Sequence, residues 1–232
     1  MGKKNSTAKK KKKATANRWS TRGIIKAMWA VFGIAVAGGL LFFVLVSTGA
    51  VGYLPEIEEL ENPIDKYASQ VISSDNELLF TYSLSDDNRI MVDYTDLSPH
   101  LIDALISTED IRYYSHSGID IIGLGRAIFK TLILNQEESG GGSTITQQLA
   151  KLLYSPRANN KIQRVFQKPV EWVIAAKLER HYTKEEIINL YLNKYDFNYN
   201  AVGIESATRT YFNKTPNELT VEEAATLVGM LK

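Results

Sequence analysis

The pattern of hydrophobic and polar positions divides the chain into three stretches. Residues 27–54 form a run of 28 residues without a charged side chain. About 20 apolar residues cross the hydrocarbon core of a bilayer, so this run predicts a transmembrane helix. Short apolar segments separated by Ser, Asp and Asn follow over residues 66–94 and favour two hairpin strands, with another extended segment at residues 89–92. Beyond residue 98, apolar side chains recur every three to four positions, which predicts a mainly α-helical body.

The expected helices have recognisable beginnings. Ser98 followed by Pro99 is a typical N-cap and first helical position. Proline is tolerated in the first turn of a helix, so another helix is expected to start near Pro169. Capping boxes, in which Thr precedes Glu or Gln by three residues, are expected at Thr183–Glu186, Thr220–Glu223 and Thr144–Gln147. The predicted helices are 98–109, 121–134 (mostly buried), one from 143 or 144, 169–182, 183–193, 204–212 and one from 220.

The charge distribution separates the start of the chain from its body. Residues 1–26 hold ten Lys or Arg and no acidic residue, whereas the remainder carries 17 basic and 26 acidic side chains. A body with that negative balance is a poor nucleic-acid binder. Because positive charge flanks transmembrane helices on the cytoplasmic side, we expect the N-terminus in the cytoplasm and the body outside it. The alternative, a cleaved signal peptide, has an apolar region of about 7–15 residues, shorter than this one.

These patterns predict four regions. The last helix shows no terminating signal before Lys232, so the body is expected to be truncated at its C-terminus. The regions are a basic cytoplasmic tail (1–22), a transmembrane helix (23–54), a juxtamembrane linker with short strands (55–92) and a helical domain (93–232).

Two polar runs interrupt the helical body and carry the candidate chemistry. Glu109 and Asp110 end the first helix of the body, and residues 143–151 place hydroxyl and amide side chains before Lys151. A positioned carboxylate can act as a general base toward an alcohol. Amides and hydroxyls suit sugar hydroxyls and phosphate oxygens. The chain has no Cys and three His, which excludes thiolate catalysis and disfavours a zinc site.

Five segments, in order and behind a membrane anchor, resemble the motifs of one family. They are residues 109–118 (Glu-Asp, an aromatic pair, then His-x-Gly), 141–151 (Gly-Gly-Ser-Thr-Ile-Thr-Gln-Gln-Leu-Ala-Lys), 168–171, 178–193 and 203–212. On these residues the chain resembles the peptidoglycan glycosyltransferases (glycosyltransferase family 51) of class A penicillin-binding proteins and monofunctional glycosyltransferases. The resemblance covers about residues 93–232. It implies a mainly α, lysozyme-like helical fold with a small β portion.

The resemblance also implies a reaction. Its substrate is lipid II, a disaccharide-pentapeptide joined through pyrophosphate to a polyprenyl chain. The 4-hydroxyl of one unit attacks the anomeric carbon of the growing glycan strand with inversion, and polyprenyl pyrophosphate leaves. Glu109 corresponds to the family's base. Glu171 corresponds to its second key glutamate, expected to order the pocket by bridging to a cation or by binding Mg²⁺ or a similar divalent cation.

The other candidates are expected to bind substrate. Cations stabilise the negative charge that develops on departing pyrophosphate, and Lys151, Lys168 and an arginine of the connector after the second motif are available. Asp110 is expected to orient Arg112 or the acceptor sugar, and His116 to tie down the turn that follows it. The complete substrate-binding set is Asp110, Ser143, Thr144, Gln147, Gln148, Lys151, Arg157, Arg164 and Lys168.

Four positions depart from the family's pattern. Gln167 stands where the third motif usually has Arg, and Leu152 follows the second motif where Asn is common. Asp196 and Asn198 replace a usual aromatic residue and a usual glycine. The segment between the second and third motifs is also a few residues longer. The candidates for the family's phosphate-binding arginine are therefore Arg157, Lys161 and Arg164.

Two other functions compete with this interpretation. A lysozyme-like lytic transglycosylase or hydrolase also depends on one Glu in a helical domain, but it needs no pyrophosphate pocket and no membrane anchor. A catalytically inactive membrane-anchored scaffold would not need Glu109, Gln148, Lys151 and Glu171 together. The expected location is a single-pass protein of the inner (cytoplasmic) membrane. The expected partners are lipid II, the growing glycan strand, cell-wall synthesis proteins and a transpeptidase domain beyond Lys232.

Overall fold

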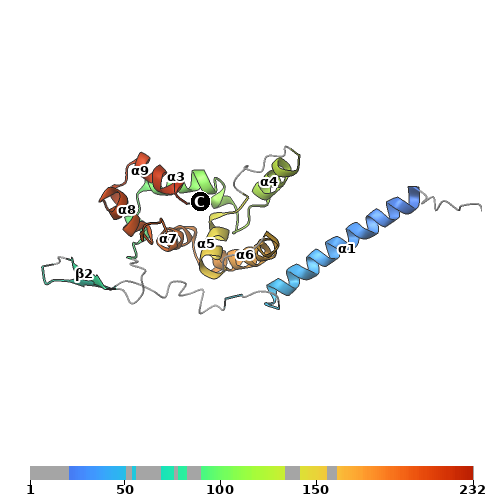
Figure 1. Ribbon diagram of the computed structural model, residues 1–232, viewed down its shortest axis with the longest axis horizontal. Coiled ribbons are helices and arrows are strands. Elements are labelled where there is room, and N and C mark those ends of the chain that lie inside the picture. Colours follow the sequence, from blue (N-terminus) through green and yellow to red (C-terminus); the bar gives the residue numbers. More distant parts are fainter. Residues whose placement is uncertain are drawn as a thin grey trace, which may run out of the picture. The chain divides into compact units, whose positions relative to one another are not determined.

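The computed structural model describes residues 21–50, 54–55, 69–75, 78–82, 90–133, 142–155 and 161–231. The chain forms two compact units, residues 1–44 and residues 45–232. The described residues are mainly α-helical, with one small sheet (Figure 1), which confirms the expected fold class.

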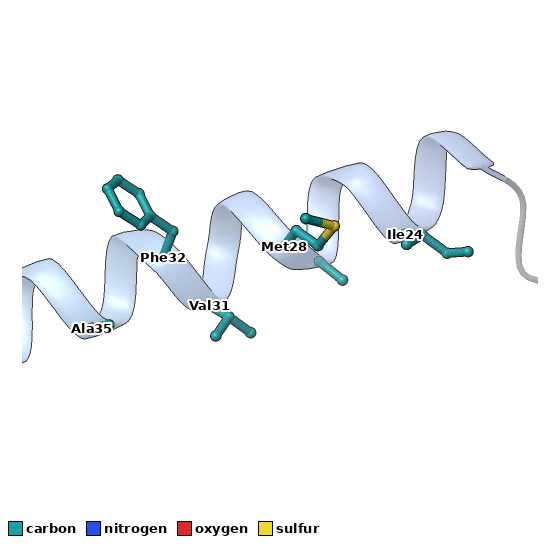
Figure 2. A pocket seen from close by; sticks show the side chains of 6 residues that line it. Ile24, Met28, Val31, Phe32 and Ala35 are labelled. Carbon is teal, nitrogen blue, oxygen red and sulfur yellow. The ribbon is translucent and has the colours of Figure 1, made fainter. Parts of the chain in front are cut away.

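Helix α1 (Thr21–Ser47) is the one described helix that is long and apolar enough to cross a membrane. At 1.5 Å per residue its 27 residues span about 40 Å, more than the roughly 30 Å of a hydrocarbon core. Figure 2 shows apolar side chains of α1 that line a pocket. The lining residues are Ile24, Ala27, Met28, Val31, Phe32 and Ala35. An apolar, exposed helix of this length fits a single-pass membrane anchor.

A two-stranded antiparallel sheet forms the hairpin predicted after the apolar run. Strand β1 (Ser69–Ile72) pairs with β2 (Leu78–Tyr82), with Ser69 opposite Tyr82 and Ile72 opposite Leu78. The register shifts after Val71, where the ladder has an irregularity. The hairpin supplies the small β portion of the expected fold.

Seven further helices lie in the described part of the second unit (Figure 1). They are α3 (Pro99–Glu109), α4 (Ile121–Ile133), α5 (Ile145–Tyr154), α6 (Lys161–His181), α7 (Lys184–Lys194), α8 (Ile204–Phe212) and α9 (Val221–Gly229). One-turn 3₁₀ helices occur at Tyr94–Asp96, Tyr113–Ser115 and Pro216–Glu218.

Helix α5 packs against both α6 and α7, while α3 packs against α9. Ile145 and Leu149 of α5 are fully buried in the core, as are Leu101 and Leu105 of α3. Burying a side chain of this kind contributes about 1.5–3 kcal/mol. Since α5 is held on two sides, the polar residues along it also have defined positions.

The predicted N-caps of three helices are confirmed. Ser98 Oγ accepts the His100 N–H at 3.3 Å and starts α3. Thr183 and Thr220 each complete a capping box, with Glu186 and Glu223, at the starts of α7 and α9.

The predicted start of a helix near Pro169 was wrong, because α6 begins at Lys161 and runs through the proline. An internal proline removes one hydrogen bond and presses on the preceding turn, at a cost of about 3 kcal/mol. The helix persists because Ile174 and Leu178 are fully buried in the core. An ion pair between Arg164 and Glu171 also bridges the turns on either side of Pro169.

Two other expectations were wrong. Helix α4 was expected to be mostly buried, but Ile121, Ile122 and Phe129 are 77%, 70% and 54% exposed. Periodicity shows which side chains share a helix face, but it does not show whether another element covers that face. Residues 90–92 form no strand, because Val92 exchanges hydrogen bonds with the Asn193 side chain at 3.0 and 3.2 Å.

Candidate active site

The C-terminal end of α3 places Glu109 beside residues of α5 and α7. Glu109 is the last residue of α3, as predicted. Its Oε2 accepts a hydrogen bond from Gln148 Nε2 at 2.6 Å, and Gln148 Oε1 accepts one from the Tyr191 hydroxyl at 2.9 Å. Residues of three helices therefore form one chain of hydrogen bonds that ends on the Glu109 carboxylate.

Tyr191 sets the direction of this chain. When the phenol donates, Gln148 presents its oxygen to Tyr191 and its NH₂ group to Glu109. Burial raises the pKa of the Tyr191 phenol above its ordinary value of 10.0, and the nearby charge of Glu109 raises it further. The phenol therefore stays protonated at neutral pH, and Gln148 keeps a donor aimed at the carboxylate.

Asp110 ties the residue beside Glu109 to the start of α5. Its side chain accepts the Ile145 N–H at 3.2 Å, and both of its oxygens lie 3.0 Å from His116 Nε2. The prediction that His116 ties down its turn is thus confirmed. Of the two roles expected for Asp110, orienting Arg112 was wrong, because Arg112 pairs with Asp120 instead, and orienting the acceptor sugar stays a prediction. Asp110 therefore helps to hold Glu109 in place relative to α5.

Thr144 and Gln147 hold the turn at Gly118. Thr144 Oγ1 donates to the Gly118 carbonyl at 2.7 Å and accepts the Gln147 N–H at 3.1 Å. Of the predicted capping box, the N-cap role of Thr144 is confirmed. The return bond from the Gln147 side chain was wrong, because Gln147 Nε2 donates to the Gly118 carbonyl at 3.2 Å. Gly118 has a φ of +85°, and a Cβ there would lie 3.0 Å from the Ala175 carbonyl oxygen, so the turn requires glycine. Both polar side chains are buried and support this turn.

A cluster of charge surrounds Glu171 on α6. Glu171 is fully buried, with Arg164 Nη1 at 2.6 Å from Oε1 and Lys168 Nζ at 2.9 Å from Oε2. Oε2 accepts no hydrogen bond from the described residues, so charge alone holds the pair with Lys168. Lys168 Nζ also donates to Ser143 Oγ at 3.0 Å, just before α5. Two cations and one carboxylate leave a net positive charge next to a helix N-terminus, which favours anions.

Glu171 is a poor ligand for the divalent cation that the resemblance suggested. Such ions take several oxygen ligands, whereas each oxygen of Glu171 already faces a cation. Within the described ranges no group of three His, Asp or Glu side chains could hold a metal ion. The charges that this cluster offers to a phosphate are therefore those of Arg164 and Lys168.

Lys151 lies in the last turn of α5. It is exposed and lines a pocket of about 290 Å³ together with Gln148. Ser143 and Thr144 thus precede α5, which carries Gln148 against Glu109 and Lys151 near its end. Arg157 lies outside the described residues.

Sequence reasoning missed two groups of side chains. One is Tyr191, which sits in the fourth motif but shows no pattern that names Gln148 as its partner. The other is Glu179, whose Oε1 accepts hydrogen bonds from Thr146 Oγ1 at 2.6 Å and Lys184 Nζ at 2.8 Å. Lys184 also donates to the His116 carbonyl at 2.7 Å, so this group supports the same turn as Asp110. A capping Thr183 marks the start of α7 in the sequence, but nothing there pairs Lys184 with Glu179.

Comparison with known proteins shows which family the chain resembles. The sequence model of the "Transglycosylase" family matches residues 75–232. The chain is 38% identical over 197 residues to penicillin-binding protein 1A of Haemophilus influenzae, covering 85% of this chain and 20% of that protein. It is 37% identical over 182 residues to penicillin-binding protein 1A of Escherichia coli (77% and 20%). Penicillin-binding protein 2a of Streptococcus pneumoniae is 32% identical over 234 residues (98% and 30%).

The chain spans about a fifth of the length of the penicillin-binding proteins 1A that it matches. The family match covers more than half of the chain and includes Glu109, Gln148, Lys151 and Glu171. This chain belongs to the transglycosylase family.

Proposed function

We propose that this chain is a peptidoglycan glycosyltransferase that polymerises lipid II into glycan strands by inverting transfer and releases polyprenyl pyrophosphate. The observation that carries the proposal is the hydrogen-bond chain Tyr191–Gln148–Glu109 at the edge of a pocket that also contains Lys151. The hydrogen-bond chain and the pocket together place a carboxylate, an amide and a cation in one site. The family and the names of the relatives support the same activity.

Glu109 acts as the general base in this proposal. The sugar 4-hydroxyl is a weak nucleophile at neutral pH, and a carboxylate that takes its proton during attack typically accelerates such a step by about 10²–10⁴-fold. The hydrogen bond from Gln148 fixes the direction of Oε2. In this proposal the second oxygen, Oε1, accepts the proton of the acceptor hydroxyl.

Positively charged side chains stabilise the leaving group in this proposal. Pyrophosphate needs no proton to leave, but its departure adds negative charge that nearby cations stabilise. Glu171 holds Arg164 and Lys168 in fixed positions, and Lys168 also contacts Ser143 at the start of α5. We assign pyrophosphate binding to this cluster together with Lys151, and a divalent cation enters only as a companion of the pyrophosphate itself.

The apolar helix and the greater length of the relatives extend the proposal. The basic residues before α1 support an N-terminus in the cytoplasm and a catalytic unit outside it, at the surface where a lipid-linked substrate lies. The relatives are much longer and carry the name penicillin-binding protein. A transpeptidase domain in the same polypeptide and contacts with cell-wall synthesis proteins are therefore part of the proposal.

The test is polymerisation of lipid II by the purified chain in detergent. We expect glycan polymer and free polyprenyl pyrophosphate, and a loss of about 100-fold or more in kcat for Glu109→Gln. Glu185→Gln, an exposed substitution in the first turn of α7, is the matched control. Breakdown of isolated cell wall without polymerisation would refute the proposal in favour of a lytic enzyme. A folded but inactive chain, or an active Glu109→Gln variant, would contradict it as well.

A further inference from the structure

The pocket beside Glu109 has a wall that the catalytic residues do not account for. It holds about 290 Å³, close to the lower end of the about 300–1,000 Å³ typical of small-molecule sites, which suits one sugar ring. Gln148 belongs to both the pocket and the hydrogen-bond chain to Glu109, so a ring bound there lies next to the base. The lining residues are Gln148, Lys151, Leu152, Tyr195, Asp196, Asn198 and Leu231.

One wall comes from a backbone segment in an unusual conformation, the segment 196–202. Asn198, Tyr199 and Asn200 have φ values of 68°, 50° and 61°, all in the left-handed region. Residues other than glycine rarely adopt this region, although Asn is enriched there, and each such residue stores conformational strain. Strain of this kind persists only where the surrounding structure imposes it, and it gathers at functional sites.

Several anchors impose this conformation. Asp196 and Val202 form a β-bridge, and the Phe197 N–H donates to the Ala201 carbonyl at 2.9 Å. Phe197 is fully buried, and its carbonyl accepts the Tyr211 hydroxyl at 2.7 Å. Within the turn, Asp196 Oδ1 accepts the Asn198 N–H at 2.9 Å. The segment therefore presents Asp196 and Asn198 from a rigid base.

Asp196 and Asn198 are also two of the positions at which the sequence resemblance led us to expect other residues, an aromatic residue and a glycine. A left-handed φ of 68° at Asn198 explains why glycine serves there, and Asn is the substitution that tolerates this φ while adding an amide to the pocket. Asp196 adds a carboxylate. Burial raises the pKa of the neighbouring Tyr195 phenol, and the charges of Glu109 and Asp196 raise it further, so both carboxylates act on one side chain.

We propose that Asp196 and Asn198 are specificity-determining residues that bind hydroxyl and amide groups of one sugar ring of the glycan substrate, beside Glu109. This inference rests on the proposed glycosyltransferase function. A carboxylate accepts hydrogen bonds from sugar O–H and N–H groups, and an amide both donates and accepts. The ring belongs either to the lipid-linked monomer or to the growing strand, and both carry the same groups.

The first test is Asn198→Gly, because glycine tolerates the left-handed backbone and removes only the amide. We expect an unfolding temperature equal to or above that of the unmodified chain, and a KM about 3–5-fold higher with kcat within about twofold. Asn213→Gly is the matched control: Asn213 also has a positive φ, of 54°, but it is the C-cap of α8 and does not line the pocket. We expect it to leave KM unchanged.

The second test is Asp196→Asn, which keeps an oxygen for the turn but removes the charge. Because a hydrogen bond to a charged group is stronger than one to a neutral group, we expect Asp196→Asn to raise KM about 5–10-fold. Asp103→Asn, on the exposed side of α3, is the control, and we expect it to leave KM unchanged. KM is measured for lipid II at a saturating concentration of a short glycan primer that still carries its polyprenyl pyrophosphate, and for that primer at saturating lipid II. The value that rises identifies the bound strand. Polymerisation with both KM values unchanged in both variants would overturn the inference. An inactive unmodified chain would instead overturn the proposed function.

Discussion

Replacing Tyr191 by Phe tests whether the hydrogen-bond chain, rather than Glu109 alone, makes the base. The substitution keeps the buried ring and removes only the hydroxyl that donates to Gln148 Oε1 at 2.9 Å. Without that donor, the hydrogen bond that orients the Gln148 amide is lost. Its NH₂ group can then turn away from Glu109. The perturbation therefore reaches the carboxylate through one intervening side chain.

The expected size follows from the bond that is lost. A hydrogen bond of this kind contributes about 0.5–1.5 kcal/mol net, and 1.36 kcal/mol corresponds to tenfold in rate. We therefore expect kcat for lipid II polymerisation to fall about 3–10-fold while KM stays within about twofold. The unfolding free energy should fall by about 1 kcal/mol.

Tyr113→Phe is the matched control for this prediction. Tyr113 is likewise fully buried, and its hydroxyl donates to the Lys184 carbonyl at 2.8 Å, away from Gln148. We expect the same loss of stability with an unchanged kcat. Equal kcat values for the two variants would refute the argument that Tyr191 acts on Glu109 through Gln148.

Three further predictions concern stability, measured by thermal unfolding in detergent. Glu171→Gln leaves Arg164 and Lys168 without their buried counter-charge. Because these cations are 35% and 30% exposed, we expect the unfolding free energy to fall by about 1–3 kcal/mol rather than by the 3–5 kcal/mol of a fully buried pair. An unchanged unfolding temperature would contradict the ion-pair cluster. Ser98→Ala removes the N-cap of α3 and a second hydrogen bond, to the Leu219 carbonyl at 3.2 Å, so we expect the unfolding free energy to fall by about 1–2 kcal/mol. A fall below about 0.3 kcal/mol would show that water replaces both hydrogen bonds. Burial raises the pKa of the Tyr113 and Tyr191 phenols above 10.0, so above about pH 10 the unfolded chain binds fewer protons than the folded one. The contribution of these phenols to stability is therefore intact below about pH 10 and is lost as the pH rises above it. The fall in unfolding temperature between about pH 9 and pH 11 should be shallower in Tyr191→Phe, and an equal slope would exclude this tyrosine as a cause.

Local features were predictable because the interactions behind them lie within a few residues of one another. The length of the apolar run predicts α1, and the caps at Ser98, Thr183 and Thr220 bond to backbone two or three residues away. The position of Glu109 at the end of α3 follows from the same periodicity. The sequence by itself therefore determined the fold class, the long apolar helix α1, most helices of the body and the candidate base.

Only the tertiary structure decided what these residues contact. Gln148 and Tyr191 are 43 positions apart, and the packing of α5 against α7 brings them together. The start of α6 before Pro169 depends on burial downstream, which outweighs the local penalty of the proline. The left-handed run that begins at Asn198 is held by distant partners such as Tyr211. In each case the deciding energy comes from side chains that meet only after the helices pack, and a pattern along the chain does not contain that information.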